Sequence, residues 1–412
     1  MEVQNDPSER RRKRQVLWSK LFSELEEFVM TTKEFRAWSS LPTKIMEFIM
    51  RRLYYSDQAR VRAVCKGWRS MGKVSPLEQL PWLILWGKES GRSFKLIDPQ
   101  YNRVYSMNME NTVFQGKDLS EVEICACKNS WFLMSFSAKK HVYSFVAYSP
   151  FVNSLERIME LPILISKQYI QIATFSSNPT SPDCVFFTLC YGNTTVDIST
   201  CSRGDTAWTI RTFDNYLPMH EPVNTVRRSA RIIWHMNYSV GQYSNVAYLD
   251  GKFYWASYYP KMVGTYSIVE KDYHLYEYPP LESMIGSIHF VKSNKDRKIL
   301  LVRMESEDRD HWRCPGHDIC RLDHSQMTWT KVESLDDQVL FLGYHNDAVA
   351  LPAEDKETKN KVYLCKNISI KYFEIGSGNH SCLLNQYNVH NDLEYPHRFY
   401  IEPPSQVTDN VV

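Results

Sequence analysis

The pattern of hydrophobic and polar positions changes character once along the chain, near residue 79. Before that point apolar residues recur every three or four positions, which is the spacing of amphipathic helices. After it, short runs of β-branched and aromatic residues are separated by Gly, Pro, Asn and Asp, which is typical of strands and turns. We therefore expect a mainly β protein with a small α-helical module at its N-terminus.

Residues 15–36 predict an amphipathic helix. Leu17, Leu21, Leu25 and Phe28 form one apolar stripe, and charged residues lie opposite. Such a stripe needs a covering surface, which is either the domain that follows or the groove of a separate partner.

Residues 41–70 predict two or three short helices, because apolar residues recur at helical spacing in two groups. Pro42 suits the first turn of the first helix, and Ser56 and Asp57 are both capable N-caps for the second. Gly67 and Gly72 indicate a helix end or a local break. A helical module of this length buries little apolar surface by itself. We therefore expect its stability to depend on the neighbouring chain or on a partner protein.

Beyond residue 79, the clearest strand signals are the runs 142–148, 185–191 and 299–304. Asp250-Gly251 separates the runs 246–249 and 252–255, which is the strongest hairpin signal in the chain. These patterns predict an all-β domain over residues 79–402.

A weak internal repeat runs through this region. In each unit a strand is ended by a short Leu-Pro-like segment, which we call a stop. Four such stops occur at comparable intervals, namely Leu161-Pro162, Leu217-Pro218, Tyr278-Pro279 and Glu333-Ser334-Leu335. The interval is long for a four-stranded propeller blade, but loop insertions are tolerated. The repeat favours a β-propeller of about six blades. A pair of β-sandwiches is the alternative, because the repeat lacks a strict motif.

Composition narrows the class of protein further. The 49 Lys and Arg residues nearly balance 47 Asp and Glu, so no global field draws the chain onto nucleic acid or an anionic membrane. The ten cysteines contain no CxxC pair, which indicates reduced thiols. No secretory leader is evident, and the apolar run 80–86 is far shorter than the roughly 20 residues that span a bilayer. We expect a soluble protein of the nucleus, the cytoplasm or both.

The basic run Arg10 to Arg14 has two interpretations of equal weight. It is either a nuclear-localisation segment or a solvated tail.

Four candidate zinc ligands lie close together, with His311 nearby: Cys314, His317, Cys320 and His324. Structural zinc sites usually use two well-separated ligand pairs, and Cys320 falls in a predicted strand. We therefore predict no metal. The chain also lacks phosphate-loop, GxSxG, HExxH and Rossmann patterns, so we predict no cofactor and no catalytic residues.

The stretch Leu41-Pro42 to Leu53, continuing through Asp57, Arg60, Val64-Cys65-Lys66 and Trp68-Arg69, closely resembles the plant F-box pattern. The remainder resembles the C-terminal domain of a large plant group of F-box proteins, once catalogued as a domain of unknown function and now described as a β-propeller. The best-matching pieces are 130–133, 148–151, 160–162, 251–254, 329–332 and 340–343.

This resemblance implies four regions, which are a basic tail and amphipathic helix over 1–37, an F-box over 38–78, the propeller over 79–402 and a tail over 403–412. It also implies that the chain is the non-catalytic substrate-recognition subunit of an SCF-type cullin-RING E3 ubiquitin ligase. The F-box would bind the Skp adaptor, which joins the cullin scaffold, while the β-domain binds an unknown target protein. The implied adaptor-binding residues are Leu41, Pro42, Ile45, Ile49, Leu53, Val64 and Trp68.

Two other functions stay open. A ligand-binding propeller acting as a small-molecule sensor could use Tyr254, Trp255, Tyr258 and Tyr259, although aromatics of this kind also serve sheet packing. A propeller hydrolase is the third, and the missing nucleophile motif counts against it.

Overall fold

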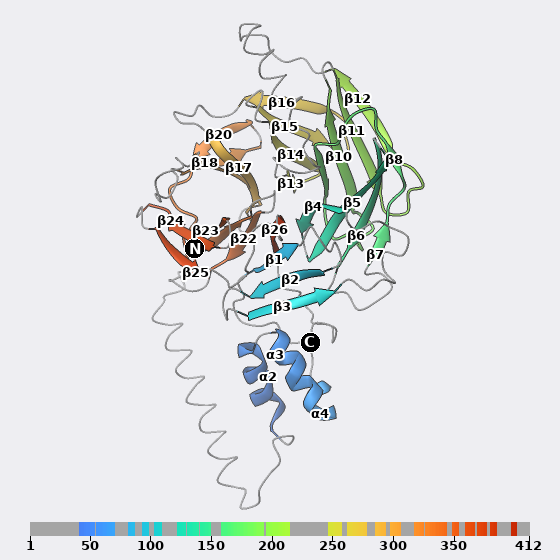
Figure 1. Cartoon of the computed structure of the whole chain (residues 1–412). Coiled ribbons are helices and arrows are strands. Elements are labelled where there is room, and N and C mark those ends of the chain that lie inside the picture. The colour runs from blue at the N-terminus through green and yellow to red at the C-terminus, as the bar shows by residue number, and fades with distance from the viewer. Residues whose placement is uncertain are drawn as a thin grey trace, which may run out of the picture. The chain divides into compact units, whose positions relative to one another are not determined.

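The computed structural model divides the chain into two compact units, residues 1–79 with 405–412 and residues 80–404 (Figure 1). The residues that it describes are 41–53, 55–70, 81–86, 93–98, 103–108, 122–128, 130–139, 141–149, 158–192, 195–214, 246–257, 262–277, 285–293, 297–305, 317–324, 326–343, 348–353, 359–366, 369–376, 380–384 and 397–401. The amphipathic helix expected over 15–36 and the basic run 10–14 lie outside these residues.

The described part of the first unit consists of helices α2 (Thr43–Arg52), α3 (Tyr55–Val64) and α4 (Lys66–Arg69), as the spacing of apolar residues predicted. Two details of the prediction are wrong. Ser56 and Asp57 lie inside the first turn of α3, because that helix already begins at Tyr55. The break falls at Cys65, which separates α3 from α4, whereas Gly67 lies within α4.

The described residues of the second unit form six sheets, which we call blades 1 to 6. Each blade has a strand nearest the ring centre and further strands outside it. In order from that inner strand, blade 1 contains β26 (His397–Ile401), β1 (Trp82–Trp86), β2 (Ser93–Asp98) and β3 (Arg103–Asn108). Blade 2 contains β4 (Val122–Lys128), β5 (Trp131–Lys139), β6 (Val142–Tyr148) and β7 (Ile158–Glu160), and β8 (Leu164–Ile165) also pairs with β6.

The next three blades follow the chain order. Blade 3 contains β9 (Ile172–Phe175), β10 (Val185–Tyr191), β11 (Thr195–Ser202) and β12 (Thr209–Asp214). Blade 4 contains β13 (Val246–Leu249), β14 (Lys252–Ser257), β15 (Met262–Ser267) and β16 (Tyr273–Glu277). Blade 5 contains β17 (Ile285–Lys292), β18 (Ile299–Glu305), β19 (His317–Asp323) and β20 (Thr328–Lys331).

Blade 6 departs from this order. It contains β22 (Ala348–Pro352), β21 (Gln338–Leu342), β23 (Lys361–Lys366), β24 (Ser369–Glu374) and β25 (His380–Leu384). Here β21 pairs antiparallel with β22 and parallel with β23. The strand that comes first in the chain is therefore second in the sheet, an arrangement that residue periodicity along the chain does not encode.

The blades form a closed ring, because every blade packs on the next through buried apolar side chains (Figure 1). The Phe94 and Phe132 rings, 6.1 Å apart, join blades 1 and 2. The C-terminal strand β26 pairs with β1 and so completes blade 1. The architecture is a propeller, as predicted, and not a pair of sandwiches.

The repeat seen in the sequence marks the outer ends of blades. Leu161-Pro162 follows β7, and Glu333-Ser334-Leu335 follows β20. The other two stops lie outside the described residues, shortly after the ends of β12 and β16. Asp250-Gly251 forms the tight turn between β13 and β14, with φ of 49° and 80°, the left-handed backbone that this residue pair tolerates.

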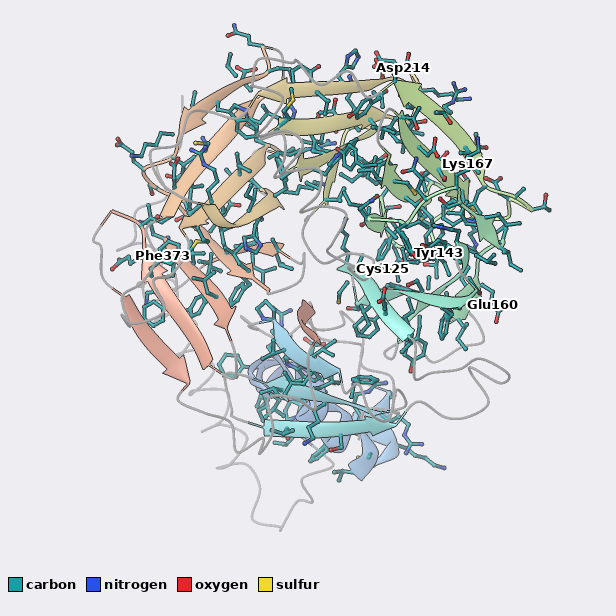
Figure 2. The ribbon with its side chains drawn as sticks, turned by 45° about the horizontal axis from the view of Figure 1, so that its top comes forward. Cys125, Tyr143, Glu160, Lys167, Asp214 and Phe373 are labelled. Atoms are coloured by element: carbon teal, nitrogen blue, oxygen red, sulfur yellow. The ribbon has the colours of Figure 1, made fainter. Side chains whose placement is uncertain are left out.

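The core between blades 2 and 3 includes Cys125 and Tyr143, and Phe373 belongs to the cluster between blades 5 and 6 (Figure 2). Near the ring axis, the Lys128 ammonium donates to the carbonyl oxygens of Phe175 at 3.3 Å and Val246 at 2.9 Å. One side chain of blade 2 thereby ties the inner strands of blades 3 and 4.

Candidate functional site

The helical module begins at the Leu-Pro pair that the sequence singles out. Pro42 is the residue before α2, and its carbonyl oxygen accepts from the backbone N–H groups of Ile45 and Met46 at 3.0 and 3.1 Å. Proline has no N–H to leave unpaired at a helix start, so it suits this position. Leu41 and Pro42 therefore set where α2 starts.

The end of α2 is held by a side chain that sequence reasoning missed. Gln58, on α3, is only 5% exposed. Its amide Nε2 donates to the carbonyl oxygens of Met50 at 2.6 Å and Leu53 at 3.1 Å. Helix ends leave carbonyls without intrahelical partners. The Leu53 N–H also donates to the Met50 carbonyl at 3.1 Å, so Gln58 adds a second donor there and supplies a donor to the Leu53 carbonyl. A polar residue inside a helical stretch gave no signal for this role, because hydrophobic spacing reports only apolar positions.

The start of α4 is capped by a thiol. The Cys65 Sγ accepts from the backbone N–H of Trp68 at 3.4 Å, and Cys65 itself has an extended backbone. This bond fixes the first turn of α4, in which Trp68 lies. The Val-Cys-Lys-x-Trp motif therefore has a local structural basis.

The seven predicted adaptor-binding residues differ in exposure. Val64 is 66% exposed, whereas Ile45 is only 5% exposed and contributes mainly to the packing of the module. Pro42 is exposed, and the remaining four are half-buried: Leu41, Ile49, Leu53 and Trp68. Their role in binding an adaptor stays a prediction.

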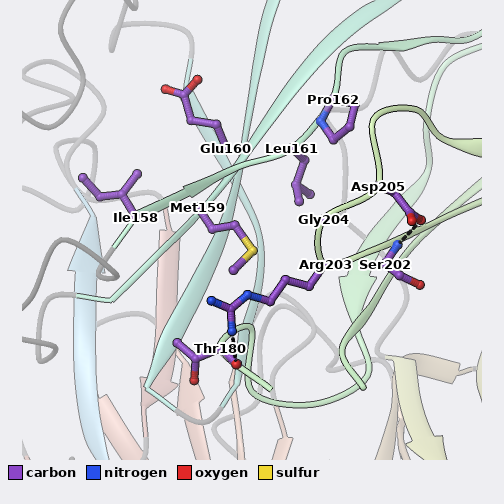
Figure 3. A pocket seen from close by; sticks show the side chains of 10 residues that line it. All are labelled: Ile158, Met159, Glu160, Leu161, Pro162, Thr180, Ser202, Arg203, Gly204 and Asp205. Atoms are coloured by element: carbon purple, nitrogen blue, oxygen red, sulfur yellow. Dashed lines mark hydrogen bonds between the residues drawn. The ribbon is translucent and has the colours of Figure 1, made fainter. Parts of the chain in front are cut away.

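The propeller has a hollow of about 430 Å³ between blades 2 and 3 (Figure 3). Blade 2 contributes residues 158–162, and turns of blade 3 contribute Thr180 and residues 202–205. Met159 and Arg203 point toward its middle, and an Arg203 Nη1 donates to the Thr180 carbonyl oxygen. The Asp205 carboxylate accepts from the Ser202 N–H at 2.8 Å, which orders the turn. Its lining mixes apolar, hydroxyl and charged side chains.

A second hollow, of about 190 Å³, lies between blades 4 and 5. It brings together Tyr254 and His324, which are far apart in the sequence, with the Tyr254 hydroxyl 3.1 Å from the imidazole Nδ1. Of the aromatic residues suggested for a sensor, Tyr254 lines this hollow. Trp255 is fully buried, and its ring lies against Gly264, while Tyr258 and Tyr259 lie outside the described residues.

Among the residues considered for zinc, the structure describes the side chains of Cys320 and His324, and His324 lines the hollow between blades 4 and 5. Cys320 lies in strand β19, as expected, and its thiol is near the buried Arg303 and Asp318 at 3.7 and 3.8 Å. Burial raises the pKa of Cys320, which opposes the thiolate that zinc requires. His311 and Cys314 lie outside the described residues. Within the described ranges, no group of three or more His, Cys, Asp or Glu side chains is placed to hold a metal.

Among the helices that the structure describes, none has the length and apolar character needed to cross a membrane.

Comparison with known proteins gives two family matches. Residues 38–78 match the F-box domain, and residues 93–389 match the KIB1-4 β-propeller. The matched ranges contain the helical module and most of the propeller described above.

The chain is also similar to several proteins of Arabidopsis thaliana. It is 32% identical over 174 residues to an F-box/kelch-repeat protein, covering 42% of this chain and 46% of that protein. It is 30% identical over 185 residues to an F-box protein, covering 44% of each. A further F-box protein is 24% identical over 311 residues, which cover 73% of this chain and 56% of the relative. The match thus covers less than two thirds of each of these relatives. Because the propeller match takes in most of its length, the chain belongs to the KIB1-4 β-propeller family, and an F-box domain precedes its propeller.

Proposed function

We propose that the chain is the substrate-recognition subunit of an SCF-type cullin-RING E3 ubiquitin ligase. The observation that carries the proposal is the division into an F-box unit and a separate compact propeller. An F-box implies binding to a Skp adaptor, and a propeller offers a large surface for a target. Each task has its own unit of the chain.

The adaptor is expected to contact the start of α2 and the end of α3. Val64 is exposed at the end of α3, so its side chain has apolar area that a partner could bury. Burying apolar surface contributes about 25 cal/mol per Å², and one interfacial hot spot contributes about 2 kcal/mol or more. Leu53 and Ile49, which are half-buried in the chain alone, have area left to bury.

The propeller is expected to hold the target beside the conjugating enzyme. This raises the local concentration of the reacting groups, and the chain then needs no acid-base residue of its own. Ubiquitin transfer would be a property of the complex.

The test is co-expression of the full chain with a Skp adaptor and a cullin, followed by size-exclusion chromatography. We expect one stoichiometric complex, and the double change Leu41→Ala with Pro42→Ala should lower adaptor affinity at least tenfold. The control is Ile163→Ala, which removes a 65% exposed side chain from the propeller and should not affect binding. A folded wild-type chain that elutes apart from the adaptor would contradict the proposal.

A further inference from the structure

The hollow between blades 4 and 5 has a wall made of residues from both blades. Residues at and beside the β13–β14 turn supply Leu249, Asp250, Lys252 and Tyr254. His324 and Met327 come from the β19–β20 turn of the next blade, and Thr265 and Tyr276 come from the neighbouring strands of blade 4. Two adjacent blades therefore enclose one small site that combines apolar side chains, hydroxyl groups and an imidazole.

The Tyr254 and His324 side chains of the wall both favour their uncharged forms. Burial raises the pKa of Tyr254 to about 12, and burial also lowers the pKa of His324. The Nδ1 atom of His324 contacts the Tyr254 hydroxyl, and its buried Nε2 has no hydrogen-bond partner among the described residues. The Tyr254 and His324 rings meet nearly edge to face, with centroids 5.5 Å apart. The pair thus presents an uncharged, aromatic surface.

The two charged residues of the wall are paired with others outside it. The Asp250 carboxylate is 2.6 Å from the Arg297 guanidinium, and the Lys252 ammonium is 3.1 Å from the Glu270 carboxylate. Both pairs are exposed to solvent, and exposed pairs of this kind contribute little. The preference of the hollow for a neutral occupant therefore rests on the uncharged Tyr254–His324 pair.

The size of the hollow restricts the occupant further. Sites for metabolites and drug-sized ligands measure about 300–1,000 Å³. At about 190 Å³, this hollow is smaller than that range and suits one side chain. A neutral side chain that has an aromatic face and one polar tip matches a wall of Tyr, Met, Leu and hydroxyl groups.

We propose that the hollow between blades 4 and 5 anchors one tyrosine or tryptophan side chain of the target protein. The inference rests on the proposed function, because it names the residue class by which the target is held. Tyrosine and tryptophan are also the residues that most often act as buried anchors of protein interfaces.

The experiment uses the full chain in complex with the Skp adaptor and side-chain analogues as probes. Ligand-observed NMR titrations would compare p-cresol and 3-methylindole with toluene and methylguanidinium. We expect one of the first two to bind with a Kd on the order of 1 mM, as small fragments do. Toluene should bind at least fivefold more weakly because it lacks a polar tip, and methylguanidinium should bind more weakly still.

The matched variants are Tyr254→Phe with Thr265→Val, which remove two hydroxyls from the hollow with little change of shape. They should weaken binding of p-cresol at least fivefold. The control Tyr363→Phe removes a hydroxyl from an equally buried tyrosine of blade 6 and should leave binding unchanged.

Three outcomes would overturn the inference. The first is that neither p-cresol nor 3-methylindole binds. The second is that toluene binds as tightly as these two probes and still does so in the double variant. The third is that methylguanidinium binds more tightly than they do. Adaptor co-elution is measured on the same samples. Loss of probe binding with intact co-elution rejects the anchor alone, whereas failed co-elution of a folded chain rejects the proposed function.

Discussion

Replacing Gln58 by leucine tests whether the F-box unit is held together as the structure shows. The change keeps a side chain of similar length in a 5% exposed position and removes the donor to the Met50 and Leu53 carbonyl oxygens. The Met50 carbonyl keeps a second donor in the variant, the Leu53 N–H at 3.1 Å, so the cost falls mainly on the Leu53 carbonyl. A buried carbonyl left without a partner costs about 1–3 kcal/mol, and leucine recovers part of that cost through apolar burial. We therefore expect a net loss of about 1 kcal/mol, roughly a fivefold change in an equilibrium constant.

The loss should appear in adaptor binding and not in the propeller. The two units are separate and compact, so the end of α2 loosens while the blades keep their packing. If the adaptor binds only the ordered form, its apparent Kd is the intrinsic Kd divided by the fraction of chains in that form. A smaller ordered fraction therefore weakens the measured affinity. The assay is isothermal titration of purified full-length variants with the Skp adaptor, together with thermal unfolding of the propeller.

The control for this experiment is Gln326→Leu, which changes an exposed glutamine in the β19–β20 turn. It should bind the adaptor as the wild type does. Adaptor affinity of Gln58→Leu within twofold of the wild type would refute the reasoning, because the two hydrogen bonds would then contribute nothing to the binding-competent form.

Two further predictions concern the propeller. Gly264→Ala should destabilise it by about 1–3 kcal/mol in denaturant unfolding, because the added Cβ would lie 2.3 Å from the ring of the fully buried Trp255, and unchanged stability would show that the ring can move aside. Burial lowers the pKa of Lys128 to about 7. The nearby Cys184 opposes this shift, and Lys292 adds a smaller lowering effect. Above pH 7 the unfolded chain then binds the proton that the folded chain has lost, so stability should rise from pH 7 to 9 by an amount on the order of 1 kcal/mol. Lys128→Met should remove that rise in parallel unfolding curves, and an identical pH slope in the variant would contradict it.

Much of the architecture follows from local patterns. The strands β6 and β10 begin and end at the predicted residues, and the Asp250-Gly251 hairpin forms where turn chemistry requires it. These features depend on residues close together in the chain. Period-two alternation and turn residues report such features directly.

What the pattern does not contain is which residues meet across blades. Tyr254 and His324 come together only because blades 4 and 5 are neighbours in a ring. The reach of Lys128 to two other blades depends on the same closure. Gln58 was missed for a related reason, since its two acceptors become available only when α3 folds back on α2. Such contacts follow from tertiary packing, which outweighs local preference.

The pairing of β26 with β1 has a consequence for the order in which this protein matures. Trp82 is opposite Ile401, so blade 1 lacks its inner strand until nearly the whole chain has left the ribosome. Pairing between segments so far apart in the chain is slow, and the edge of β1 stays unpaired until β26 is added. The helices of residues 43–69 emerge long before that and are built from local contacts. The helical module is therefore complete while blade 1 still has an open edge, so the two units reach their folded state at different times.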